Sequence, residues 1–171
     1  MKKVVQVLVL AMMLAAGAYA QVTTSGSDYS MKMSGEQSSE GVFFDPLGLT
    51  MGNSFVLSGR SNNYSSTVLS VEFNYEQSGD PSCNSISGGS WNLALYTAEG
   101  GYRGSIYGKV VEGEITWDPE SGKRDTTALL LVTGSTHNLD MEVEPDTKVS
   151  FHATTNLGDS MTRALFGGLP L

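Results

Sequence analysis

The chain has 171 residues, of which 40% are hydrophobic and only 16% charged, and its formal net charge is −8. This length suffices for one domain that buries a core without help from disulfides or metals. One cysteine and two histidines exclude a disulfide scaffold and a zinc ribbon, and the acidic balance argues against nucleic acid as a partner.

The first twenty residues have the pattern of a secretory signal peptide. Two lysines precede a mostly apolar run over residues 4–16, and the Ala-Tyr-Ala sequence at 18–20 supplies small residues for cleavage. This run is shorter than the roughly 20 residues of a membrane-spanning helix, and no later segment is apolar enough for one. We therefore expect a periplasmic or extracellular protein, with a signal peptide over residues 1–20 and one domain over 21–171 whose N-terminal part (21–41) is peripheral.

Tyr29, Met31 and Met33 alternate with polar residues, as in a strand that is buried on one face. This strand either completes the sheet of its own domain or pairs with the sheet edge of a neighbouring subunit, as in fibres built by strand donation. Pairing within the chain is favoured, because association of two chains costs additional entropy. The same three residues are the candidates for self-assembly.

A series of short strands separated by turn residues continues to the C-terminus. Residues 69–75 alternate clearly between apolar and polar side chains, and no window of twelve residues has a helical stripe. Further strand-like segments lie near 90–97, 102–111, 114–118, 126–133, 138–144 and 148–154. The pattern predicts an all-β, antiparallel sandwich of about eight to ten strands, with a closed meander barrel as the alternative.

The two tryptophans can be placed by assuming two turns. A four-residue loop at 98–101 sets Trp91 opposite Gly108, and a two-residue turn at 112–113 sets Gly108 opposite Trp117. Glycine inside a strand is costly, but here it leaves room for large rings. We therefore expect both indoles in the interior, packed over Gly108.

The opposite face of the same hairpin carries Asn92, Tyr96, Arg103 and Tyr107. The loop at 98–101 sets Tyr96 opposite Arg103, within reach of a cation–π contact. Exposed tyrosines next to hydrogen-bond donors can bind sugar rings, whose apolar faces stack on aromatic side chains. These four residues are the candidate ligand-binding site, and an ordinary strand surface is the alternative.

A second hairpin is expected over residues 139–153, with a loop at 145–147. It would place Asp140, Ser150 and His152 on one outer face, the residue types of a hydrolytic triad. Three neighbouring positions of a flat sheet lie in no cleft, and no oxyanion hole is recognisable. A solvated strand face is therefore favoured over a catalytic site.

Two further features leave chemical questions open. Asp118, Glu120 and Asp125 could hold calcium, but a plain turn is favoured because Pro and Gly stand among them and two cations follow. Cys83 has no second cysteine to pair with, so it is either an inert thiol or forms a bond between chains.

Together these patterns predict a non-enzymatic exported protein, a binding or structural component of the cell envelope or extracellular matrix. We expect it to bind itself or a surface glycan and to need no cofactor or metal. A carbohydrate-binding module is the second hypothesis, and a small exported hydrolase is the third.

Overall fold

The computed structural model describes residues 31–45, 48–76, 80, 82–136, 139 and 141–171, with the backbone alone for 38–45 and 48–51. The expected signal peptide, Tyr29 and Asp140 therefore lie outside the described residues.

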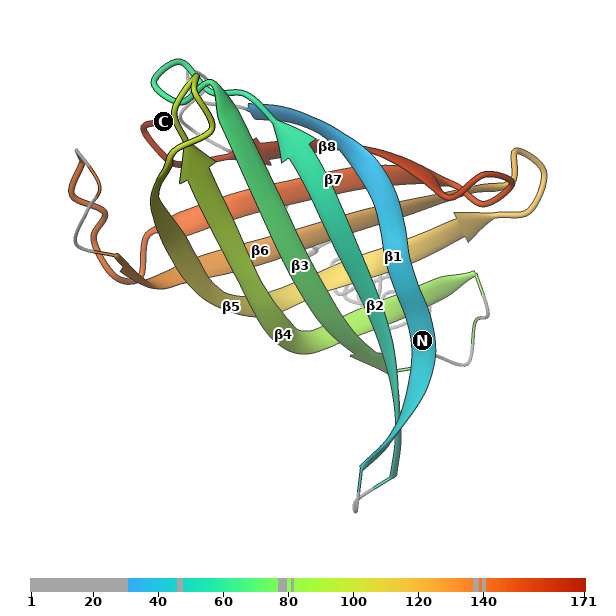
Figure 1. The fold of residues 1–171 in the computed structure, drawn as a ribbon. Coiled ribbons are helices and arrows are strands. Elements are labelled where there is room, and N and C mark those ends of the chain that lie inside the picture. Colours follow the sequence, from blue (N-terminus) through green and yellow to red (C-terminus); the bar gives the residue numbers. More distant parts are fainter. Residues whose placement is uncertain (1–30, 46–47, 77–79, 81, 137–138, 140) are drawn as a thin grey trace, which may run out of the picture.

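Eight strands form one closed antiparallel barrel in which every strand pairs with its neighbours in sequence (Figure 1). The strands are β1 (Met31–Asp45), β2 (Gly48–Gly59), β3 (Ser66–Glu76), β4 (Cys83–Tyr96), β5 (Tyr102–Asp118), β6 (Lys123–Ser135), β7 (Lys148–Asn156) and β8 (Met161–Gly167). The prediction of an all-β chain is confirmed. The predicted sandwich is wrong, and the meander barrel that stood as its alternative is the fold.

The barrel closes because β1 pairs with β8, from Met31 opposite Phe166 to Glu36 opposite Met161. Long strands twist and coil strongly, which brings the first and last strands of a meander together. The sequence had suggested a break near residue 112, but β5 runs through it for 17 residues. The pairing of β5 with β6 shifts its register between Val110 and Glu112, so a bulge replaces the predicted turn at 112–113.

Inward-facing aromatic side chains fill the middle of the barrel. Phe55 of β2, Phe73 of β3 and Phe151 of β7 are fully buried. Their ring centroids lie 5.7 Å (Phe55–Phe73), 6.0 Å (Phe55–Phe151) and 5.5 Å (Phe73–Phe151) apart. Three strands from both halves of the chain are thereby held around one aromatic cluster.

The prediction for the two tryptophans is half right. Trp91 is 3% exposed and lies opposite Gly108, as expected, and its indole Nε1 donates to the Leu131 carbonyl at 3.2 Å. Trp117 is 45% exposed and pairs with Arg124 near the far end of β5. Because β5 continues instead of turning at residue 112, Trp117 is carried away from Gly108 and is not part of the core.

One end of the barrel is sealed by apolar side chains. Buried Tyr64, Val143, Leu169 and Leu171 belong to the core, and Leu139 and Met141 pack against it. We call this the sealed end; it carries the loops at 60–65 and 97–101, residues 136, 139 and 141–147, and the C-terminal residues, which lie toward the upper left of Figure 1.

The predicted hairpin over residues 139–153 is wrong. β7 begins at Lys148 and pairs with β6 and β8, not with the residues that precede it. Leu139, Met141 and Val143 alternate like a strand in the sequence, but in the structure they pack on the core at the sealed end. The prediction of which β7 residues face the interior is confirmed, because Phe151 points inward and His152 points outward.

Candidate functional site

The β4–β5 hairpin places two tyrosines face to face at the sealed end. Thr97 closes the turn, because its backbone N–H donates to Gly101 O at 2.9 Å and its carbonyl accepts from Gly100 N at 3.1 Å. Gly100 adopts φ 80°, which suits glycine. The turn brings Tyr96 opposite Tyr102, with ring centroids 5.7 Å apart and an interplanar angle of 63°.

The predicted contact between Tyr96 and Arg103 is therefore wrong in register. The β4–β5 pairing shifts between Leu95 and Tyr96, so that Leu95 lies opposite Gly104 and Tyr96 opposite Tyr102, with Arg103 skipped. A bulge of this kind adds one residue to one strand and re-aims the side chains around it. Arg103 is exposed beside the two tyrosines.

Tyr102 is held in a fixed orientation although it is 55% exposed. Its hydroxyl hydrogen-bonds to Ser105 Oγ at 2.7 Å, and Ser105 is itself buried. The Ser105 backbone N–H donates to Thr136 Oγ1 at 3.0 Å, and Thr136 N donates back to Ser105 O at 2.9 Å. The phenol is thereby linked to the end of β6 through a continuous set of hydrogen bonds.

Tyr107 is 44% exposed and lies across a glycine of the neighbouring strand. It pairs with Gly134 of β6 on one side and with Asn92 of β4 on the other. A Cβ atom at Gly134 would lie 2.8 Å from the Tyr107 hydroxyl and 3.0 Å from its Cζ atom. The glycine therefore leaves the space that the tyrosine ring occupies.

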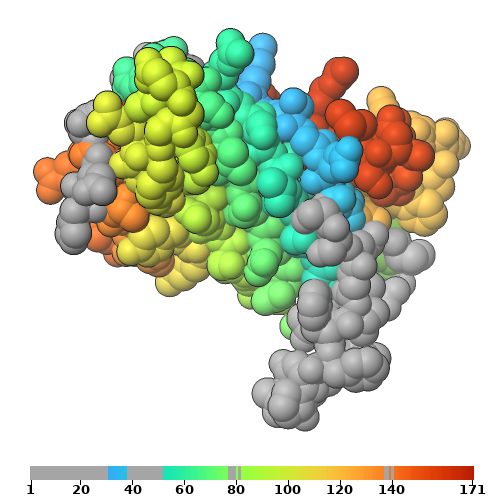
Figure 2. Space-filling model, in the orientation of Figure 1, coloured from blue at the N-terminus to red at the C-terminus, as the bar shows by residue number. Residues whose placement is uncertain are grey.

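A groove of about 590 Å³ begins at Gly134, the glycine that Tyr107 lies across. It is lined by Gly134, Ser135 and Thr136 at the end of β6 and by Leu139, Met141, Glu142, Val143 and Pro145. Gly134 and Thr136 belong both to the groove and to the contacts of Tyr107 and Ser105. The β4–β5 hairpin and the segment that contains 141–147 lie toward the same side of the molecule (Figure 2).

We call the set Asn92, Tyr96, Tyr102, Arg103 and Tyr107 the tyrosine surface. Four of its members were predicted from the sequence, and the structure places the set on β4 and β5, with the Tyr96–Tyr102 pair separated from the Asn92–Tyr107 pair by Ala94 and Ser105. Tyr102 was missed, because the assumed four-residue loop put it opposite Thr97 instead of Tyr96. The groove was also missed, because its lining comes from a segment expected to be a strand.

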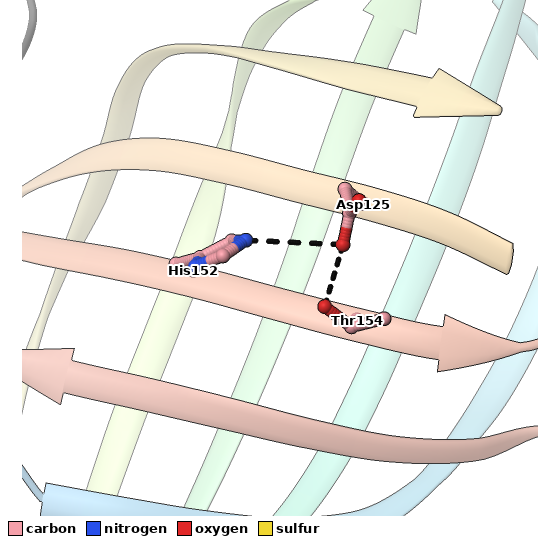
Figure 3. Close-up of polar contacts among 3 residues, drawn as sticks. All are labelled: Asp125, His152 and Thr154. Carbon is pink, nitrogen blue, oxygen red and sulfur yellow. Dashed lines mark hydrogen bonds and ion pairs between the residues drawn. The ribbon is translucent and has the colours of Figure 1, made fainter. Parts of the chain in front are cut away.

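The predicted triad residues have other partners. His152 Nε2 lies 3.8 Å from Asp125 Oδ1, and Thr154 Oγ1 donates to the same oxygen at 2.5 Å (Figure 3). Both His152 and Asp125 are about half exposed on the outer surface of β6 and β7. Ser150 Oγ makes a long hydrogen bond, 3.5 Å, to the Gly167 carbonyl. This arrangement is a strand-surface network, with Asp125 as the carboxylate partner of the histidine.

The acidic turn after β5 is organised by its own side chains. Asp118 accepts from Glu120 N at 2.9 Å and from Ser121 Oγ at 2.6 Å. The Ser121 hydroxyl, followed by the Glu120 N–H, holds the pKa of Asp118 below its ordinary value. Among the described residues, no three His, Cys, Asp or Glu side chains gather closely enough to hold a metal ion.

Cys83 is half-buried next to a carboxylate. Its thiol donates to Glu114 Oε1 at 3.0 Å. This hydrogen bond, with desolvation and the negative charge of Glu114, raises the pKa of the thiol to about 11. Since the thiolate is the reactive form, the structure favours an inert thiol at neutral pH.

Comparison of the chain with protein-family models, curated proteins and solved structures finds no match. Over the residues that the structure describes, no helix has the length and apolar character to cross a membrane.

Proposed function

We propose that this chain is a non-enzymatic exported binding protein that recognises a surface glycan through the tyrosine surface. The observation that carries the proposal is the pair of exposed phenol rings, Tyr102 and Tyr107, which are connected through Ser105 and Gly134 to residues that line a groove of about 590 Å³. Binding sites are concave, with apolar walls and a few placed polar groups. The groove has both apolar and polar lining, because Leu139 and Met141 line it together with Thr136.

The chemistry of the surface suits a polyhydroxylated ligand. The C–H face of a sugar ring can stack on a tyrosine ring, while its hydroxyls exchange hydrogen bonds with neighbouring polar groups. Arg103 and Asn92 are exposed next to the rings and supply hydrogen-bond donors. A neutral sugar also avoids the repulsion that the net charge of −8 exerts on anionic ligands.

The scaffold reduces the entropy that binding costs. Tyr102 is fixed by Ser105 and by the edge-on ring of Tyr96, and Tyr107 is fixed over Gly134. Side chains that are ordered before binding lose little rotamer freedom when the ligand arrives. A closed barrel with a packed aromatic centre is a rigid support for such a site.

The proposed export rests on the sequence, and the barrel wall is that of a protein surrounded by water. Residues 1–20 have the pattern of a signal peptide. The outward positions of β3, for example Ser70, Glu72 and Asn74, are polar and exposed, while the inward positions are apolar. This is the alternation expected for a sheet that faces water on its outer side. The proposed location, in the periplasm or outside the cell, rests on the signal-peptide pattern of residues 1–20.

A structural role through strand exchange has less support. Met31 and Met33 are buried, and β1 pairs with β2 on one edge and with β8 on the other. Strand donation needs an unpaired sheet edge. A binding role needs no unpaired strand edge, because the tyrosine surface lies on the outside of the closed barrel.

The test is binding of the full chain to a glycan array, followed by titration of a glycan found there. We expect Tyr102→Ala and Tyr107→Ala each to weaken binding by about tenfold, which corresponds to the loss of one aromatic stacking contact. Tyr107→Phe keeps the ring and should keep most of the affinity. Trp117→Ala is the matched control, because Trp117 is also a half-exposed aromatic residue but pairs with Arg124, away from the tyrosine surface. Equal binding by the tyrosine variants and the control, or no glycan bound at all, would contradict the proposal.

A further inference from the structure

Polar side chains line the interior of the barrel at the end opposite the sealed one. On β2 the buried positions run from Leu57 and Phe55 to Asn53, and on β6 they run from Leu130 and Ala128 to Thr126. Both strands thus change from apolar to polar at inward positions as they approach this end. The residues concerned, which we call the polar layer, are Gln37, Asn53, Arg124, Thr126, Thr155 and Thr162.

Two contacts place the polar layer inside the barrel. Arg124 Nη1 donates to Gln37 Oε1 at 3.3 Å, although β6 and β1 are separated around the wall by β7 and β8. A contact that skips two strands crosses the lumen. On the intervening strands, buried Thr155 and Thr162 lie opposite each other, with their hydroxyls 2.9 Å apart.

Asn53 and Thr126 lack the hydrogen bonds that buried polar groups require. Asn53 is 3% exposed and Thr126 is fully buried, yet neither amide atom of Asn53 nor the Thr126 hydroxyl has a partner. Nearly all buried polar atoms in folded proteins are hydrogen-bonded, so three unpaired atoms in one layer require an explanation. β2 and β6 lie on opposite sides of the eight-stranded wall. The unpaired groups therefore approach the lumen from two sides.

The fully buried members of the polar layer are smaller than the rings in the middle of the barrel. In the adjacent part of the interior, Phe55, Phe73 and Phe151 fill the lumen with three rings in mutual contact. In the polar layer, β2, β6, β7 and β8 contribute one asparagine and three threonines, whereas β3, β4 and β5 place the larger buried side chains Tyr75, Ile86 and Ile115 toward the same end. An eight-stranded barrel has room for its own side chains or for one small ligand. The smaller side chains lie on the neighbouring strands β6, β7 and β8, with Asn53 facing them from β2.

We propose that the polar layer binds one small neutral molecule that carries both hydrogen-bond donors and acceptors, of the polyol or primary amide class. Such a molecule accepts from the Asn53 amide nitrogen, donates to the Asn53 amide oxygen and exchanges a hydrogen bond with the Thr126 hydroxyl. A neutral ligand fits because the unpaired groups are themselves neutral and burying an unpaired charge is costly. Gln37 and Arg124 are only partly buried, so they stand between the layer and the solvent. This site is independent of the tyrosine surface.

The experiment titrates the full chain with glycerol and, separately, with acetamide, and follows the Asn53 side-chain amide and Thr126 methyl signals by NMR. We expect saturable shifts of both signals with at least one probe, and about tenfold weaker binding in Thr126→Val, which keeps the shape but removes the hydroxyl. Thr127→Val is the matched control, since Thr127 is the next residue of β6 and is exposed on the outer surface. The control should bind like the wild type.

Two results would overturn the proposal. If neither probe produces a saturable shift, water alone satisfies these groups. If Thr126→Val and Thr127→Val bind a probe equally well, the probe does not reach the polar layer. Asn53→Leu provides a second variant that removes both amide contacts, and it should abolish the saturable shift of the Thr126 methyl.

Discussion

Replacing Gly108 by alanine tests how tightly β5 packs against Trp91. A Cβ atom at this position would lie 1.8 Å from the Leu131 carbonyl oxygen and 2.7 Å from Trp91 Nε1. Both atoms belong to one interaction, because the indole donates to that carbonyl at 3.2 Å. The backbone of β6 and the Trp91 ring must therefore move apart.

The expected loss has two parts. Overpacking of a well-filled interior costs about 1–3 kcal/mol. Loss of the indole hydrogen bond adds about 0.5–1.5 kcal/mol. We therefore expect Gly108→Ala to lower the free energy of unfolding by about 1.5–4.5 kcal/mol.

Urea unfolding followed by tryptophan emission measures this loss, in a Trp117→Phe background so that Trp91 alone reports. The matched control is Gly158→Ala, because a Cβ atom at Gly158 meets only Asn156 Oδ1, at 3.4 Å. The control should stay within about 0.5 kcal/mol of its parent. If Gly108→Ala is equally stable and the emission of its folded state is unchanged, the close packing described here is wrong.

Two further changes have calculable outcomes. Glu114→Ala removes the main group that raises the pKa of Cys83 to about 11, so the pKa of the thiol falls toward 9.0. At pH 8, which is below both pKa values, the thiolate fraction and the rate of alkylation by iodoacetamide should rise by up to about 100-fold. An unchanged rate would mean that the carboxylate does not control the thiol. Phe151→Ala removes one ring of the aromatic cluster and should lower the free energy of unfolding, measured with urea, by about 3–5 kcal/mol. Leu165→Ala is the control, because Leu165 is exposed on β8, and it should lower the same free energy by under about 1 kcal/mol. Similar losses in the two variants would contradict the assigned interior.

The alternation of side chains was sufficient to predict which residues face the interior on several strands. Leu93 faces Ile106 and Trp91 faces Gly108 as the sequence suggested, because a period of two leaves only two choices for each strand. The same pattern could not reveal the closure of the barrel. Pairing of Met31 with Phe166 depends on the coiling of all eight strands, which no local pattern records.

Bulges explain the remaining errors. The shift at Tyr96 redirected Tyr102 and Arg103, and the shift near Val110 allowed β5 to continue past the expected turn. One extra residue reverses every later side chain, so small errors of register become large errors of placement. Asn53 and Thr126, by contrast, could have been found. Each is a polar residue at an inward position whose next two inward positions along the strand are apolar, Phe55 and Leu57 on β2 and Ala128 and Leu130 on β6.

The pairing of β1 with β8 also has a consequence for how the chain reaches its native state. Seven of the eight pairings join strands that follow each other in sequence, but the eighth must bring together the two ends of the described chain. Contacts of long sequence separation form slowly, because the entropy of the intervening loop is lost first. Until that last seam forms, the first and last strands each expose an unsatisfied backbone edge. A newly made molecule is therefore most exposed to pairing with another copy before closure, through the same strand that later completes its own wall.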